Sequence, residues 1–150
     1  MAFLKRNQTI YAENKPYRIE KHQFSERAVF ESIVNAVAHR DYSIFGSKIR
    51  FFMFDDRLEI YSPGALPNTV TIDSIALRQA TRNELITSLL AETPIAESIG
   101  SIGRGFYMEK RGDGVPIIFE ESLTLSGRRP EYRLIDDAEL LLTIWAFQPT

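Results

Sequence analysis

The sequence predicts an α/β protein, a two-layer sandwich in which helices cover one face of a mixed, mostly antiparallel β-sheet. Two pairs of short apolar segments, in residues 48–61 and 131–147, are each interrupted by a polar turn, which is typical of antiparallel hairpins. Apolar residues recur at helical spacing in residues 25–40 and 83–91. A length of 150 residues suits one domain with one core, so we expect no internal boundary.

The N-terminal part predicts two elements before the first long helix. Residues 1–16 show no clear period, and we expect a short helix or strand that packs on the rest. Residues 17–24 alternate polar and apolar side chains and predict a strand. Ser25 is a favourable N-cap residue, and the apolar Phe24 before it can staple the helix start. A helix is therefore predicted from Ser25 to about Arg40.

That helix presents a row of polar side chains beside its apolar stripe. Glu31, Asn35 and His39 are four residues apart, so they lie on one face. Such a row is often only a solvated surface. Here it continues into Arg40 and Asp41, a dense run of functional groups that favours a binding or catalytic surface.

The two hairpins supply the predicted sheet. Residues 48–54 have almost no polar face, so we expect this strand inside the sheet, paired with residues 57–61. Residues 131–135 and 139–147 form the second hairpin, and the last strand, apolar on both faces, is expected to be central. Four further helical segments are predicted, at residues 71–78, 83–91, 106–111 and 116–125.

Composition excludes several classes of function. The net charge of −2 argues against binding of polyanions by bulk charge. The absence of cysteine excludes disulfides, thiolate-bound zinc and thiol catalysis. No apolar run approaches the ~20 residues that span a bilayer, and the N-terminus carries no visible secretory signal. We therefore expect a cytoplasmic protein without a membrane partner.

Four short motifs follow one another along the chain: Glu31-x-x-x-Asn35-Ala36-x-x-His39-Arg40-Asp41-Tyr42, residues 56–67, Arg82-Asn83 and Gly103-Arg104-Gly105. In this order they resemble the GHKL ATPases, the class of gyrase, Hsp90, histidine kinases and MutL. They are most similar to the branch found at the C-terminus of RecG-like transcriptional regulators, which are often labelled ATP-dependent DNA helicases and usually carry an N-terminal Schlafen-type AlbA domain.

The resemblance implies one GHKL-type domain over residues 1–150 that binds ATP and Mg²⁺. In these families the position of Asn35 holds the metal, and the position of Glu31 supplies the general base. For Glu31 the alternative is a surface salt bridge with Arg27. Arg40 is a candidate phosphate ligand, with a structural role at the helix end as the alternative.

The resemblance also places the adenine pocket and the phosphate cradle. Ser62 and Gly64 stand where these families bind adenine, and serine replaces their aspartate, which removes the charge assistance of a carboxylate. Gly103, Arg104 and Gly105 are expected to cradle phosphates at the start of a helix that begins at residue 106.

Two functions follow from these expectations. The first is an ATP·Mg²⁺-binding regulatory module of a DNA-binding transcriptional regulator, the C-terminal part of a longer protein, with slow or no hydrolysis. The second is a degenerate GHKL fold that binds no nucleotide and serves dimerisation or interaction. No phosphate-binding loop of the helicase-motor type is present, so the chain is no helicase motor. We expect DNA contact only through other domains, and we interpret the basic pairs at 110–111 and 128–129 as solvated surface. The domain could also bind further copies of itself and form a homo-oligomer.

Overall fold

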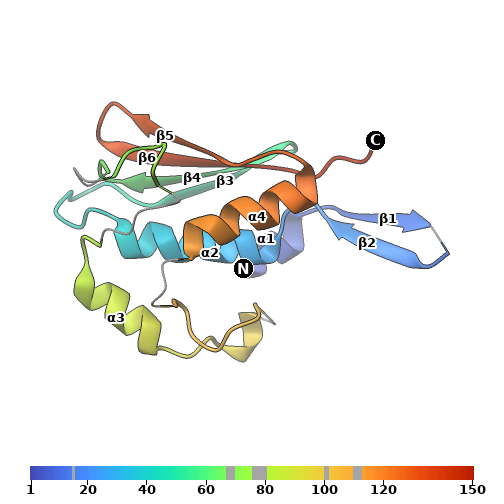
Figure 1. Ribbon diagram of the computed structural model, residues 1–150, viewed down its shortest axis with the longest axis horizontal. Helices are drawn as coiled ribbons and strands as arrows, with labels where there is room; N and C mark the ends of the chain where they lie inside the picture. Colours follow the sequence, from blue (N-terminus) through green and yellow to red (C-terminus); the bar gives the residue numbers. More distant parts are fainter. Residues whose placement is uncertain (15, 67–69, 76–80, 100–101, 110–112) are drawn as a thin grey trace.

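A computed structural model describes residues 1–14, 16–66, 70–75, 81–99, 102–109 and 113–150 (Figure 1). It shows the predicted α+β sandwich. The main sheet has four strands in the order β3-β4-β6-β5, and each neighbouring pair is antiparallel. These strands are β3 (Arg50–Met53), β4 (Arg57–Pro63), β5 (Glu131–Ile135) and β6 (Glu139–Trp145).

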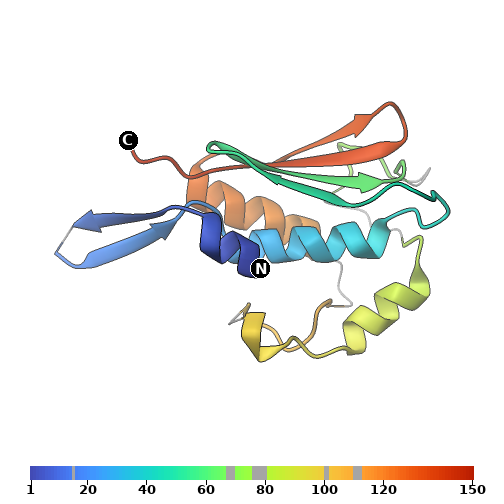
Figure 2. The same cartoon turned by 180° about the vertical axis from the view of Figure 1, so that it is seen from behind.

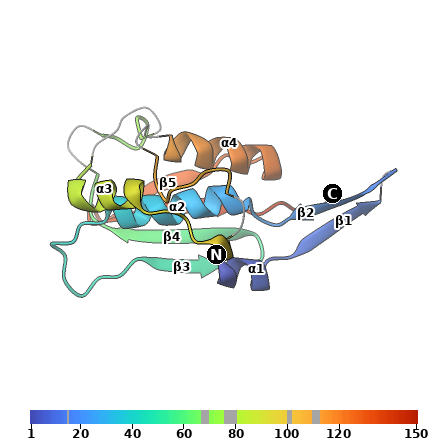
Figure 3. The same cartoon turned by 90° about the horizontal axis from the view of Figure 1, so that it is seen from below.

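Two long helices cover one face of this sheet (Figures 1 and 2). They are α2 (Glu26–His39) and α4 (Gly114–Ser126), which pack side by side beneath the strands (Figure 3). The start of α2 is the predicted one, because the Ser25 side chain accepts a hydrogen bond of 3.2 Å from the backbone N–H of Ala28. Phe24, the residue before the cap, is fully buried.

The core lies between these helices and the inner face of the sheet. Leu58 and Ile60 on β4 are paired in register with Ile144 and Leu142 on β6, and all four side chains are buried. Apolar side chains of the helix layer pack onto them, among them Phe24, Val29, Ala36 and Ile118. Burial of apolar surface in this layer fixes α2 relative to β4, which positions the polar side of α2.

The prediction for the first hairpin is correct for the pairing of its two strands and wrong for the position of its first strand in the sheet. β6 is central as expected, but β3 is an edge strand. Its apolar residues have two different partners: Phe51 and Met53 pack on the core, whereas Phe52 is 43% exposed on the other face. There Phe52 meets the ring of Tyr61 edge-on at 5.8 Å, a contact that does not require another strand.

The N-terminal elements are α1 (Ala2–Asn7), β1 (Ile10–Asn14) and β2 (Arg18–His22). The strand predicted in residues 17–24 is confirmed as β2, whereas residues 1–16 contain both a helix and a strand where a single short element was expected. β1 and β2 form a separate two-stranded antiparallel sheet that extends away from the main body (Figures 1 and 2). Its inner end is tied to the body, where Tyr11 packs edge-on against Phe147 at 5.6 Å.

The middle of the chain differs most from expectation. α3 (Glu84–Glu92) is present as predicted, but it buries none of its residues, and Leu85 is 74% exposed. A 3₁₀ turn, η1 (Glu97–Ile99), follows it. The predicted helix 71–78 is wrong for residues 71–75, of which 72–75 form a turn, and residues 76–78 lie outside the described residues.

The predicted helix at 106–111 is wrong for residues 106–109, which are not helical; its remainder lies outside the described residues. The backbone there bonds instead to the last turn of α3 and to the residue that caps it. Tyr107 N–H donates to the Thr93 carbonyl and Met108 N–H to the Leu90 carbonyl, each at 3.1 Å. These long-range bonds replace the local bonds of a helix. Among the described helices, none is long and apolar enough to cross a membrane.

Candidate functional site

A pocket of about 400 Å³ opens beside the polar face of α2. Its walls come from α2, the end of β4, the first residues of α4 and the segments around residues 82 and 104. The inner part is apolar, and the polar lining comprises Glu31, Ser32, Asn35, His39, Ser62, Thr81, Arg82, Thr87, Arg104, Glu109, Asp113 and Tyr132. The row predicted from helical spacing therefore faces a cavity.

Glu31 is buried and paired with Arg104. Its Oε1 lies 2.6 Å from the Arg104 Nη1, with the two side chains 3% and 8% exposed. Burial raises the pKa of the Glu31 carboxyl above its usual range, although the Arg104 charge opposes this shift. The alternative surface salt bridge to Arg27 is not formed, because Arg27 pairs with Glu121 at 3.5 Å.

Asn35 lies on α2 one turn after Glu31, and its side chain is next to Gly114, the first residue of α4. A Cβ atom on Gly114 would stand 2.6 Å from the Asn35 Nδ2 and 3.4 Å from the Glu31 Oε2. Only a residue without a side chain permits this close approach. Asn35, Glu31 and the N-terminus of α4 are thus brought together at one end of the pocket. The prediction missed Gly114, although a Gly-x-Gly pattern at residues 112–114 comes just before Pro116 and signals a helix start.

Ser62 and Gly64 line the pocket at the end of β4. The Ser62 hydroxyl donates to the carbonyl of Ala36 at 3.2 Å, so its oxygen retains acceptor capacity toward the cavity. Gly64 has a φ of +121°, and a Cβ there would overlap the Arg82 guanidinium and lie 2.8 Å from the Asp41 Cβ. Glycine is required at this position by both backbone angle and space.

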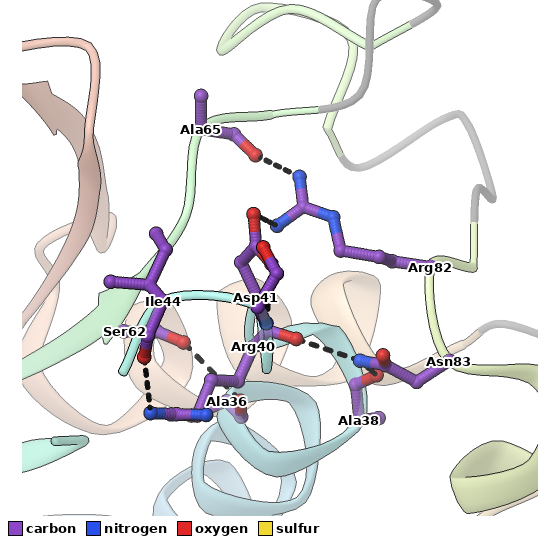
Figure 4. Close-up of polar contacts among 10 residues, drawn as sticks. Ala36, Ala38, Arg40, Asp41, Ile44, Ser62, Ala65, Arg82 and Asn83 are labelled. Carbon is purple, nitrogen blue, oxygen red and sulfur yellow. Dashed lines mark hydrogen bonds and ion pairs between the residues drawn. The ribbon is translucent and has the colours of Figure 1, made fainter. Parts of the chain in front are cut away.

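Asp41 and Arg82 form an ion pair of 3.5 Å behind Gly64 (Figure 4). Arg82 also donates to the Ala65 carbonyl at 2.5 Å, which holds the chain after β4. The Ser43 side chain and backbone N–H both donate to Asp41 and lower the pKa of its carboxyl, with the Arg82 charge adding to the effect.

Arg40 does not line the pocket. Its guanidinium donates to the carbonyls of Ile44 (3.2 Å) and Ser47 (2.5 Å) and lies over the Tyr42 ring. Tyr42 in turn donates to the Val37 carbonyl at 2.7 Å, near the end of α2. The structure places Arg40 in the capping and loop network that was the alternative to phosphate binding.

Gly103 and Gly105 are also away from the pocket lining, and no atom approaches the position of a Cβ on either residue. The described residues that follow them, 106–109, are not helical, and the next described helix begins at Gly114. Arg104, between them, does line the pocket, but its guanidinium is turned to Glu31. The residues brought together are therefore Glu31, Asn35, Ser62, Gly64 and Arg104.

The oxygen donors of the pocket decide whether it could hold Mg²⁺. Among the described residues, no three His, Cys, Asp or Glu side chains gather in a way that could hold a metal ion. Mg²⁺ commonly takes only one or two protein ligands and completes its shell with phosphate oxygens and water. The Asn35 carboxamide suits that arrangement, in which the nucleotide would supply the remaining charged ligands.

The family match identifies the class of this domain, which is ATPase-like. Residues 46–144 match the family described as "Putative ATP-dependent DNA helicase recG C-terminal", and the chain belongs to this family. The DIP2311 protein from Corynebacterium diphtheriae has a similar solved structure, with a TM-score of 0.75 and 21% identity. That likeness, which shows the fold alone, covers 95% of this chain and 27% of the other. No curated protein matches the chain.

Proposed function

We propose that this domain binds an adenine nucleotide with Mg²⁺ in the pocket beside α2. The observation that carries the proposal is the meeting of Asn35, Glu31 and the N-terminus of α4 at one end of that pocket. Family membership adds an ATPase-like domain type. A volume of about 400 Å³ falls within the usual range for small-molecule sites.

The phosphates would lie at the start of α4. The first backbone N–H groups of a helix are unpaired within it and carry positive partial charge, so they attract phosphate oxygens. Gly114 leaves this helix start open toward Asn35. When bound there, Mg²⁺ would neutralise phosphate charge, with the Asn35 oxygen as its protein ligand.

The base would enter the apolar part of the pocket, where Ile60, Leu140 and Leu142 from the sheet form the lining. Ser62 offers a hydroxyl oxygen there to the adenine amino group. A neutral acceptor gives a weaker hydrogen bond than a carboxylate does, so we expect modest affinity. Glu31 would act on the attacking water, and its ion pair with Arg104 would keep turnover slow.

In this proposal the domain is the nucleotide-sensing part of a DNA-binding transcriptional regulator. Support comes from the family description, which names the C-terminal part of a protein related to DNA helicases. DNA would be contacted by other parts of such a protein. The domain would report the nucleotide state to them.

Calorimetric titration of ATP with Mg²⁺ tests the proposal. We expect sub-millimolar affinity in the wild type and its loss in Asn35→Ala. Asn7→Ala is the matched control, because Asn7 lies on α1 and bonds only to the Phe3 carbonyl, at 2.7 Å. No heat at millimolar nucleotide, with the protein folded, would refute nucleotide binding.

The second candidate is an interaction domain that binds no nucleotide. The exposed apolar residues Leu85 and Leu89 favour it, since they stand four apart on α3 and are 74% and 54% exposed. On this hypothesis the domain self-associates through α3. Sedimentation should then show a dimer in the wild type and a monomer in Leu85→Ser, whereas a wild-type monomer would exclude this candidate.

A further inference from the structure

The Glu31 carboxylate lies between two groups that both attract anions. One oxygen, Oε1, is 2.6 Å from the Arg104 guanidinium. The other, Oε2, is 3.4 Å from the position of a Cβ on Gly114, the first residue of α4. The negative charge of Glu31 therefore stands beside the helix start that would attract a phosphate.

Arg104 is held in place by its surroundings as well as by Glu31. Its guanidinium donates to the Tyr107 carbonyl and lies 5.3 Å from the centre of the Phe30 ring. Separation of a buried ion pair is costly unless another anion replaces the one that leaves. A phosphate group is such an anion, and a guanidinium binds it with two parallel hydrogen bonds.

We infer that Glu31 competes with the terminal phosphate of the nucleotide for Arg104 and for the start of α4, so that Arg104 selects triphosphates over diphosphates. This inference rests on the proposed function. When the terminal phosphate takes the guanidinium, the Glu31 carboxylate is released toward the pocket. Arg104 then acts as a positioning residue for Glu31, in addition to binding the phosphate.

If Glu31 competes with the terminal phosphate, removal of its charge should strengthen the binding of ATP. Glutamine in Glu31→Gln keeps the shape of the side chain but loses the charge that holds Arg104. ATP should then bind about tenfold tighter than to the wild type, because a buried charge pair no longer has to be broken. ADP affinity should change little, since ADP lacks the group that competes.

Removal of the guanidinium should have the opposite effect. Arg104→Met should bring the ATP and ADP affinities close together. Because Arg104→Met leaves Glu31 buried without its partner, the double variant Glu31→Gln/Arg104→Met serves as a second test with no buried charge at this place. It should show the same small preference for ATP. Arg27→Met is the control, as Arg27 pairs with Glu121 outside the pocket lining.

Titrations of ATP and ADP with Mg²⁺ into these folded proteins distinguish the outcomes. Tighter ATP binding in Glu31→Gln, lost in the double variant, supports the inference, even if the wild type binds too weakly to measure. Nucleotide binding that is equal in wild type and Glu31→Gln overturns the inference and leaves the proposed function standing. Absence of binding in both proteins at millimolar nucleotide overturns both.

Discussion

The side-chain amide of Asn83 donates a hydrogen bond of 2.7 Å to the carbonyl oxygen of Arg40, the residue that caps α2. The same Nδ2 atom lies 2.9 Å from the Ala38 carbonyl (Figure 4). Asn83 is also the N-cap residue of α3, yet its side chain makes no bond to that helix. It thus connects the end of one helix to the beginning of the next and fixes one wall of the pocket.

Asn83→Ala should therefore destabilise the fold. Two partly buried carbonyls would each lose a partner, which costs about 1–3 kcal/mol. Urea denaturation gives this difference in the free energy of unfolding. Asn7→Ala is the control, because it removes an exposed bond to the Phe3 carbonyl, and surface changes of this kind usually cost less than about 0.5 kcal/mol. Equal losses in the two variants would contradict the connecting role of Asn83.

Gly64→Ala should cost more than Gly46→Ala. Both glycines have positive φ, +121° and +80°. A side chain at Gly46 meets no atom within 4 Å, so alanine there pays only for the backbone conformation, about 1–3 kcal/mol. A Cβ at Gly64 would in addition displace Arg82 and break its pair with Asp41. The comparison is made by thermal or urea unfolding, and similar losses would show that the chain after β4 moves freely.

The features of the site that depend on neighbours in the chain could be predicted from the sequence, whereas those that depend on tertiary contacts could not. The helix from Ser25 and its row of Glu31 and Asn35 follow from spacing and capping, which depend on neighbours in the chain. The capping network around Arg40 depends on Asn83, more than 40 positions away in sequence. Spacing within one helix cannot reveal such a partner.

The two glycine motifs illustrate the same limit. The resemblance places the phosphate cradle at residues 103–105, because the order of the motifs along the chain matches. Long-range backbone bonds from Tyr107 and Met108 prevent a helix there. The helix predicted at 116–125 is α4, which begins at Gly114, and its packing against α2 depends on contacts that no local pattern encodes.

Gly114→Ala should separate binding from stability. Alanine is favoured over glycine in helices by up to about 1 kcal/mol, which offsets the cost of displacing the Asn35 side chain, so the free energy of unfolding should change little. The new Cβ would stand 2.6 Å from the Asn35 Nδ2 and displace that side chain, so calorimetry should show ATP binding reduced at least tenfold. Gly105→Ala is the control, because its Cβ would meet no atom within 4 Å. If Gly105→Ala lost ATP binding and Gly114→Ala did not, the phosphates would be bound by residues 103–105 and not by the start of α4.

The burial of Glu31 predicts how stability depends on pH. Its folded pKa is raised above the ordinary value of 4.5, because burial outweighs the opposing charge of Arg104. A carboxyl with a raised pKa favours the folded state below its unfolded pKa, and this contribution is lost as the pH rises through the folded pKa. Wild-type stability should therefore fall relative to Glu31→Gln as the pH rises above about 4.3. Urea unfolding at several pH values measures the difference.

Asp41 should affect the pH dependence of stability in the opposite direction to Glu31. Hydrogen bonds from Ser43 lower the pKa of the Asp41 carboxyl. Its contribution is present above the unfolded pKa and is lost as the pH falls through the folded pKa. Asp41→Asn should accordingly destabilise the protein at neutral pH and have less effect in acid. Parallel pH profiles for Glu31→Gln and Asp41→Asn would contradict both assignments.

Glu31→Gln should also abolish turnover while nucleotide remains bound. Glu31 stands one helical turn before Asn35, at the end of the pocket where the phosphates are proposed to lie. Loss of a general base typically lowers the rate about 10²- to 10⁴-fold. Phosphate release under saturating ATP·Mg²⁺ measures this directly, which removes any effect of altered affinity. Glu26→Gln is the matched control on the same helix, because Glu26 pairs with Lys5 and does not line the pocket. Equal turnover in the wild type and Glu31→Gln would refute the catalytic role of Glu31.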